Sequence, residues 1–192
     1  MKIITKNIDY NYHLYDIEYI KEYQEEFIKD AELAQLRFNY NFPNFSSTKL
    51  YRYYNFFNLT AGSLHYYQLL KDLKIIIRDY SNTEDPLWFQ SWINYHKSNE
   101  ILDWHQHTDS TFHGYVSIDP KDTKTVFTNY EVFNEIGKVY IGQSYVPHKV
   151  VSLTNFESHR ITLGFDVFDY AAMNKMNTNY GAIDVNIGMI PI

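Results

Sequence analysis

The amino-acid sequence predicts a mainly β fold, a jelly roll supported by two helices near the N-terminus. Long stretches of helical periodicity occur only before Pro86, and short strand-like segments separated by turn-forming clusters follow it. Aromatic residues make up 18% of the chain, and Tyr and Phe suit strands that pack two sheets together. Short strands with no helical pattern between them are typical of a sandwich or barrel.

The first part of the chain carries the two expected helices. Residues 16–38 place apolar side chains at helical spacing, and Asp16 is a suitable N-cap. Residues 63–80 carry one continuous apolar stripe, with Thr60 or Ser63 available as a cap. We expect an edge strand within residues 1–15 and a loop over 39–47, whereas 48–58 match no clear pattern.

The second part of the chain reads as strands, and no internal repeat or linker divides it. We therefore expect a single domain over residues 1–192. Its parts are a helical support region (about 1–86), a jelly-roll core (about 87–168) and a C-terminal closing segment (169–192), which forms a strand or a flap. The expected strands are 87–96, 100–108, 112–118, 125–133, 137–141, 144–151 and 159–168.

Composition excludes several classes of function. The chain contains no cysteine, so disulfides, Cys-based metal sites and cysteine nucleophiles are ruled out, and a metal must be held by His, Asp or Glu. The formal net charge of −6 argues against nucleic acid as a partner, because there is no basic excess to displace counterions. No apolar run is long enough to cross a membrane. We expect a soluble, cytoplasmic protein.

The histidine-rich stretch at residues 103–118 is the strongest candidate for chemistry. His105, His107 and Asp109 follow one another at every second position. In an extended strand, side chains at this spacing project to one side, so these three residues predict a metal-binding face.

Two later positions extend this constellation. His148 follows Pro147 in one expected strand, and Arg160 begins another. In the latter strand Arg160 and Thr162 share a face with the small Gly164. A guanidinium beside a hydroxyl on an enclosed face suits a carboxylate, which Arg binds through two parallel hydrogen bonds. We therefore expect Arg160 to hold an organic anion.

Together these motifs resemble the Fe(II)/2-oxoglutarate-dependent dioxygenases. A His-x-His or His-x-Asp pair, a distal His and an Arg-x-Thr occur here in the order that is typical of that family. The text from Asn94-Tyr95 through His105-x-His107 to His113-Gly114-Tyr115-Val116 is most similar to its compact prolyl-hydroxylase-like branch in bacteria and phages. The resemblance covers roughly residues 87–168.

The resemblance implies a double-stranded β-helix, similar to the cupin fold, that holds one Fe(II) and uses 2-oxoglutarate as cosubstrate. His148 would be the distal ligand, and Arg160 with Thr162 would bind the far carboxylate of 2-oxoglutarate. The other two ligands come from His105, His107 and Asp109, and two sets remain open: His105 with His107, or His107 with Asp109. If Asp109 is not a ligand, it is expected to orient His107 from behind.

The activity implied is hydroxylation of a small-molecule or peptidyl substrate, such as an amino-acid side chain, with formation of succinate and CO2. Two alternatives remain. A cupin-type metalloprotein also uses His-x-His and a distal His, although the cupin Gly and Pro spacings and the following Glu are absent. A non-catalytic jelly-roll binding module is the other, because the fold alone does not define a function.

Overall fold

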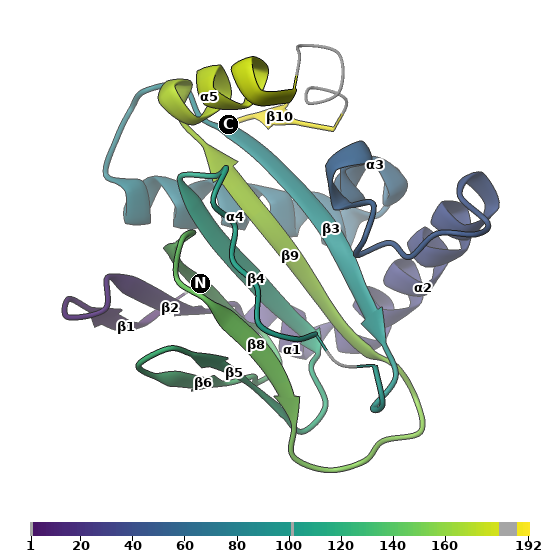
Figure 1. Ribbon diagram of the computed structural model, residues 1–192. Coiled ribbons are helices and arrows are strands. Elements are labelled where there is room, and N and C mark those ends of the chain that lie inside the picture. Colours follow the sequence, from purple (N-terminus) through teal and green to yellow (C-terminus); the bar gives the residue numbers. More distant parts are fainter. Residues whose placement is uncertain (1, 101, 181–187) are drawn as a thin grey trace.

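The computed structural model describes residues 2–100, 102–180 and 188–192, and only the backbone of residues 177–180. Two antiparallel sheets face each other as in a double-stranded β-helix, so the predicted jelly roll is confirmed (Figure 1). The larger sheet has the order β1 (Lys2–Asn7), β2 (Tyr12–Asp16), β7 (Lys138–Gln143), β4 (Phe112–Asp119), β9 (Arg160–Phe168), β3 (Trp88–His96) and β10 (Ile190–Pro191). The smaller sheet has the order β6 (Glu131–Phe133), β5 (Thr123–Phe127) and β8 (His148–Ser152).

Helices cover the face of the large sheet that is turned away from β8 (Figure 1). The apolar stripe predicted for residues 63–80 is buried there, and Ser63 caps this helix by accepting a hydrogen bond from the Tyr66 backbone N–H. The helices are α1 (Glu18–Glu22), α2 (Gln24–Asn41), α3 (Phe56–Leu59), α4 (Leu64–Ser81) and α5 (Tyr170–Tyr180), with a 3-10 turn, η1, at Tyr51–Tyr53.

Strand β9 separates the helical core from the space between the sheets. Alternate side chains of β9 pack with the helices in the main core: Ile161, Leu163, Phe165 and Val167. The intervening positions, which include Arg160, Thr162 and Gly164, face the smaller sheet and line a cavity there. The alternation predicted for this strand is therefore confirmed.

Three expected elements are divided or shortened in the structure. The predicted helix at 16–38 is divided into α1 and α2, because Tyr23 leaves the helical region with φ −118° and ψ 35°. The predicted strand at 125–133 is divided into β5 and β6 by a turn. The predicted strand at 144–151 begins only at His148, because residues 144–146 form a turn and bend.

The predicted strand at 100–108 is wrong over most of its length. His105 exchanges two backbone hydrogen bonds of 2.9 and 3.0 Å with His148, and the Leu102 carbonyl accepts one of 3.1 Å from the Val150 N–H, but among the described residues of this segment only His105 forms a bridge with β8. The His107 N–H donates to the Ser144 carbonyl. Ser144 lies in the turn before His148, so this bond does not continue the register of the His105–His148 pair. This irregular pairing leaves His105 and His107 without the parallel orientation that a continuous strand would impose.

The chain ends agree in part with expectation. The edge strand expected within residues 1–15 is confirmed, because β1 forms one edge of the large sheet, and β2 adds a second strand beside it. The closing segment forms α5 and the short β10, while residues 181–187 of that prediction lie outside the described residues.

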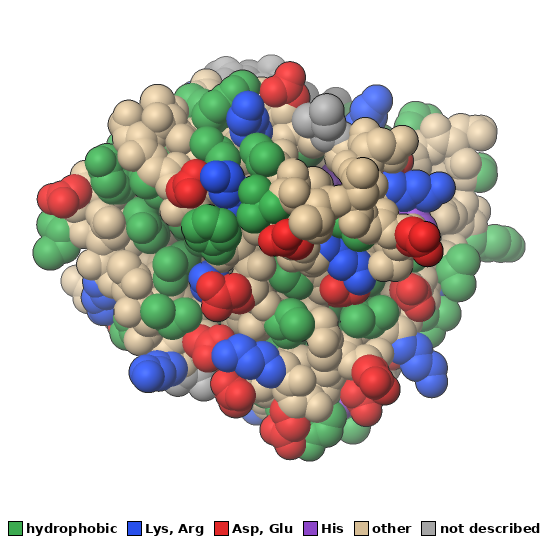
Figure 2. All heavy atoms as spheres, turned by 90° about the horizontal axis from the view of Figure 1, so that it is seen from below, with side chains coloured by type: hydrophobic (Ala, Val, Ile, Leu, Met, Phe, Trp, Pro, Cys, Tyr) green, Lys and Arg blue, Asp and Glu red, His purple; other side chains and the backbone are tan. Residues whose placement is uncertain are grey.

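The surface agrees with the modest negative charge. Lys and Arg side chains are interspersed with Asp and Glu over the face shown in Figure 2. Within the described ranges, no helix combines the length and the apolar character needed to cross a bilayer.

The sheet contact at Gly114 gives a test of this packing. A Cβ on Gly114 would overlap the Phe165 ring and the Tyr140 carbonyl oxygen, both on strands adjacent to β4. We expect Gly114→Ala to lower the free energy of unfolding by about 1–3 kcal/mol, measured by urea denaturation. Leu36→Ala, on the exposed face of α2, is the control and should change it by less than about 0.5 kcal/mol. Equal effects of the two substitutions would contradict the packing described.

Candidate metal centre

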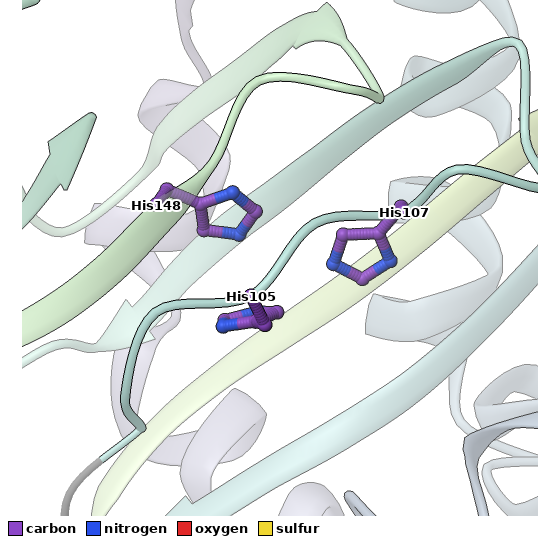
Figure 3. Close-up of side chains that lie close together, drawn as sticks. All are labelled: His105, His107 and His148. Atoms are coloured by element: carbon purple, nitrogen blue, oxygen red, sulfur yellow. The ribbon is translucent and has the colours of Figure 1, made fainter. Parts of the chain in front are cut away.

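Three histidines from separate segments meet between the two sheets. His105 and His107 come from the irregular segment before β4, and His148 is the first residue of β8. One ring nitrogen of each lies within 4.8 Å of those of the other two, so the three can hold one metal ion. Figure 3 shows the rings arranged around a common space. The structure thus brings together three of the four residues that the sequence proposed as metal ligands.

Hydrogen bonds orient each of these rings through its Nδ1 atom. The His105 Nδ1 lies 2.7 Å from the Asp103 carbonyl oxygen, and the His148 Nδ1 lies 3.1 Å from that of Val146. The His107 Nδ1 contacts the Asp166 carboxylate at 3.1 Å. Carbonyl and carboxylate oxygens only accept, so each Nδ1 donates and each Nε2 keeps a free lone pair.

The His107 Nε2 atom supplies an independent sign that a ligand belongs here. It is buried and has no hydrogen-bond partner within the described part of the chain. A buried polar nitrogen without a partner is costly, and a metal ion satisfies it. Imidazole nitrogens suit iron, zinc and related transition metals, so these residues fit the metal centre that the sequence predicted.

Two of the three rings, His105 and His148, are held in the neutral form that binds a metal. Burial, followed by the neighbouring histidines, lowers the pKa of His148 to about 2. Burial also lowers the pKa of His105. A metal ion competes with protons for imidazole nitrogens, so lowered pKa values favour metal binding at neutral pH.

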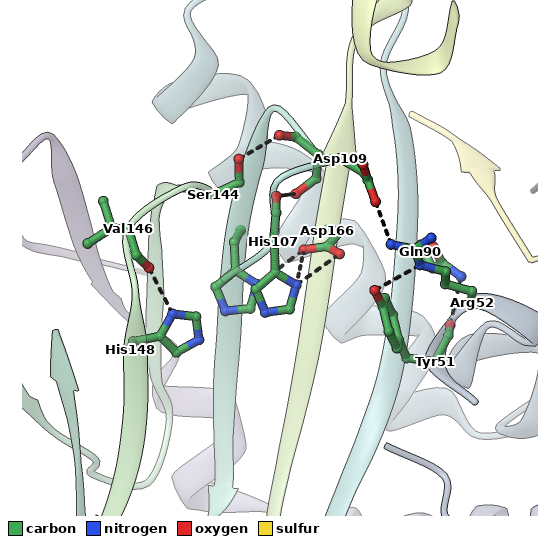
Figure 4. A network of polar contacts seen from close by, with 11 residues as sticks. Tyr51, Arg52, Gln90, His107, Asp109, Ser144, Val146, His148 and Asp166 are labelled. Carbon is green, nitrogen blue, oxygen red and sulfur yellow. Dashed lines mark hydrogen bonds and ion pairs between the residues drawn. The ribbon is translucent and has the colours of Figure 1, made fainter. Parts of the chain in front are cut away.

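Asp109 lies away from this group. Its carboxylate forms an ion pair of 2.5 Å with the Arg52 guanidinium, and these two residues line a small cavity on the other side of His107. Figure 4 shows this pair apart from His148. Of the clusters of potential ligands among the described residues, none contains Asp109. The residue found behind His107 is Asp166, not Asp109.

A cavity of about 210 Å³ connects the three histidines with Arg160 and Thr162. None of the described residues that line it is an Asp or a Glu. Its polar lining consists of the histidines, one arginine and neutral side chains: Thr48, Tyr51, Trp92, Asn94, Gln106, Tyr115, Thr125 and Thr162. A cavity with a cation and no carboxylate is suited to an anionic ligand.

Arg160 is the charged residue of this cavity. Its side chain is 4% exposed, its Nε atom has no hydrogen-bond partner, and it forms no ion pair with any described residue. Burial lowers its pKa to about 10, so it remains charged at neutral pH. The Tyr115 hydroxyl is also buried without a hydrogen-bond partner. Two unsatisfied donors in one cavity indicate a site for an acceptor such as a carboxylate.

The sequence interpretation missed His113 and Asp166. Both are buried, and each lies directly opposite the other on the adjacent strands β4 and β9. Burial alone would raise the pKa of Asp166, but the neighbouring His107 and His113 outweigh it and hold that pKa well below its usual range. A signal was available, since Asp166 shares the even-numbered face of β9 with Arg160 and Thr162.

The choice between the two ligand sets can be tested by metal binding. We expect His105→Ala to weaken Co(II) binding by more than about 100-fold, because it removes one of the three ring nitrogens that can bind the ion. Asp109→Asn should change the dissociation constant by less than about threefold. Competition with a chromogenic chelator measures both. Loss of binding in Asp109→Asn with retention in His105→Ala would place Asp109 in the coordination sphere.

The cavity also predicts a pH dependence through His96, which pairs with Arg160 across β3 and β9. Burial, followed by the Arg160 charge, lowers the pKa of His96 from 6.5 to about 4. The unfolded chain therefore takes up this proton before the folded protein does, and stability falls as the pH drops from about 7 to 4.

We expect His96→Gln to reduce the loss of unfolding free energy between pH 7 and pH 5 by about 1–2 kcal/mol. The glutamine retains a polar partner for Thr48, which bonds to His96 at 3.0 Å. Urea denaturation of the metal-free protein at both pH values measures the effect. Parallel pH profiles for the two proteins would show that His96 does not contribute.

Comparisons with known proteins give only distant similarities. No family model matches the chain, and no curated protein matches it. Among solved structures, an iron-bound HygX from Streptomyces hygroscopicus matches 57% of this chain and 69% of its own at 12% identity, with a TM-score of 0.44.

Two further structures show the same range of similarity. A 2OG-Fe(II) oxygenase family oxidoreductase from Burkholderia pseudomallei matches 54% of this chain and 58% of its own, at 15% identity and a TM-score of 0.42. A cupin-2 domain containing protein from Shewanella frigidimarina matches 44% and 72%, at 16% identity and a TM-score of 0.32. The fold therefore follows from the strand order of this chain, and conclusions about chemistry rest on its own site.

Proposed function

We propose that the protein is an Fe(II)- and 2-oxoglutarate-dependent oxygenase that hydroxylates an organic substrate. One observation carries the proposal: a buried arginine that forms no ion pair with a described residue shares a cavity with three convergent histidines, and none of the described residues that line it is an Asp or a Glu. The histidines provide a metal site, and the arginine provides a site for an organic anion. A cosubstrate that contacts both must carry a metal-binding group and a carboxylate, as 2-oxoglutarate does.

Strand β9 supports such a ligand because it presents groups from both sites on one face. Arg160 and Asp166 share that face and are six residues apart. Asp166 contacts His107 and so marks the metal end of this face, while Arg160 marks the other end. The Arg160 side chain extends from its end into the cavity that the histidines also line.

Each group of this chain has a defined part in the proposed reaction. His105, His107 and His148 would hold Fe(II), which would supply the oxidative chemistry: one oxygen atom of O2 would enter the substrate and the other would enter succinate, with release of CO2. Arg160 orients the cosubstrate by binding its far carboxylate, assisted by Thr162, whose hydroxyl accepts a hydrogen bond of 3.3 Å from Asn94. The Tyr115 hydroxyl supplies a further donor to that carboxylate.

Charge balance favours the same assignment. Three neutral imidazoles leave the two positive charges of the metal uncompensated, and Arg160 adds a third positive charge to the cavity. A dianionic cosubstrate offsets most of this charge in a site whose histidines and arginine are largely buried. As substrate we propose a small molecule or a peptidyl side chain, such as that of an amino acid.

Substitution of Arg160 tests the proposal directly. We expect Arg160→Met to weaken 2-oxoglutarate binding to the anaerobic Fe(II) protein by about 10–100-fold, because charge-assisted hydrogen bonds to the carboxylate are lost. Iron affinity should remain within about twofold, since Arg160 is not a ligand. Titration of the visible charge-transfer band measures the first quantity, and chelator competition measures the second.

Arg37→Met is the matched control, because Arg37 is an exposed residue on α2 that bonds to the Leu59 carbonyl oxygen. Unchanged 2-oxoglutarate affinity in Arg160→Met would refute the role given to Arg160. A protein that binds iron but neither binds 2-oxoglutarate nor forms succinate would be a cupin-type metalloprotein. A protein that binds no metal would be a non-catalytic jelly-roll module.

A further inference from the structure

Behind the proposed metal centre lies a buried carboxylate shared by two histidines. Asp166 is 3% exposed, and its Oδ1 atom lies 3.1 Å from the His107 Nδ1 and 3.2 Å from the His113 Nδ1. Figure 4 shows Asp166 on the side of His107 that is turned away from His148. Both rings donate to the same carboxylate, so its negative charge is held by two imidazole N–H groups.

This arrangement matters because the three proposed ligands are all neutral. In sites that contain a carboxylate ligand, the negative charge lies directly on the metal. Here the carboxylate is that of Asp166, which is hydrogen-bonded to the proposed ligand His107 and is not itself a proposed ligand. A carboxylate that accepts the Nδ1 proton of a ligating histidine raises the basicity of the other ring nitrogen.

Resting on the proposed metal centre, we propose that Asp166 supplies through His107 the negative charge that a carboxylate ligand would otherwise supply, and that His113 holds Asp166 in position. Asp166 and His113 are thus positioning residues. Asp109 does not take this role, because its carboxylate forms an ion pair with Arg52, and both residues line the small cavity beside His107.

The packing around His113 explains how the carboxylate is kept in place. The His113 and His107 rings are stacked, with centroids 3.8 Å apart and planes inclined by 12°. The Trp92 ring stacks on both, and it occupies the space that a Cβ on Gly164 would fill. Asp166 and His113 face each other in register on β9 and β4, which brings the two side chains together on one face of the sheet.

The test compares metal binding by the unmodified protein and by Asp166→Asn, which keeps the shape of the side chain and removes its charge. We expect Co(II) affinity to fall by about 10–100-fold at an unchanged stoichiometry of one ion, with a shift of the Co(II) absorption bands. Asp119→Asn is the matched control, because Asp119 also lies on this sheet but pairs with Lys121. It should leave the affinity and the spectrum unchanged.

The same Asp166→Asn comparison, made in a second variant, separates an effect of the lost charge from an effect of disturbed structure. In His107→Ala the ring through which Asp166 would act is gone, while His105 and His148 still offer two nitrogen ligands. We expect Asp166→Asn to change the weaker Co(II) binding of this background by less than about threefold, against about 10–100-fold in the unmodified protein. If Asp166→Asn weakens binding equally in both backgrounds, Asp166 has only a structural role and the inference is wrong.

Nitrogen-15 NMR of the histidine rings in the unmodified Zn(II) protein gives a measurement that needs no variant. We expect His107 and His113 both to carry a proton on Nδ1. A His113 ring protonated only on Nε2 would overturn the inference.

The outcomes also separate this inference from the proposed function. If the unmodified protein binds no metal, the proposed function fails. If the unmodified protein binds one Co(II) ion, and Asp166→Asn binds Co(II) with the same affinity and the same spectrum, only the present inference fails. A stoichiometry of two that falls to one in Asp166→Asn would show that His107, His113 and Asp166 ligate an ion themselves, which would also overturn the inference.

Discussion

The register of β9 between β3 and β4 is the constraint on which the site depends. Hydrogen bonding on both sides places Arg160 opposite His96, Gly164 between Trp92 and Tyr115, and Asp166 opposite His113. A shift of one residue would turn the apolar side chains of β9 into the cavity and its polar side chains into the helical core. Burial of the odd-numbered side chains against α2 and α4 therefore also determines where the charged groups lie.

The two charges of β9 have different environments, although both are buried. Arg160 forms no ion pair with a described residue and lines the cavity, whereas Asp166 is satisfied by two histidine N–H groups. Burying an uncompensated charge costs several kcal/mol, so an unpaired buried cation is best explained by a ligand that it binds. The paired anion needs no external ligand, and it acts on the protein's own histidines. The same strand thus provides a site for an anion at one end and a support for the metal ligands at the other.

Much of the fold was accessible from the sequence because it depends on periodicity. The stripe of α4, its Ser63 cap and the alternation in β9 are local patterns, and each was predicted with nearly the observed bounds. The division of the predicted 16–38 helix at Tyr23 was not, since no Gly or Pro in that stretch marks a break. The segment around His105 was misread as a strand because its alternation resembles one, while its pairing with β8 is limited to one bridge.

The sequence by itself determined the inventory of the site: histidines without cysteine, a distal histidine, and an arginine and a threonine on one strand face. These follow from residue type and spacing, which are local properties. Only the tertiary structure decided which of these groups meet. It directed Asp109 to Arg52, brought His148 to His105 and His107, and placed Asp166 with His113 behind them. The physical reason is that contacts between β4, β8 and β9 depend on the register of strands far apart in the chain, which no local pattern encodes.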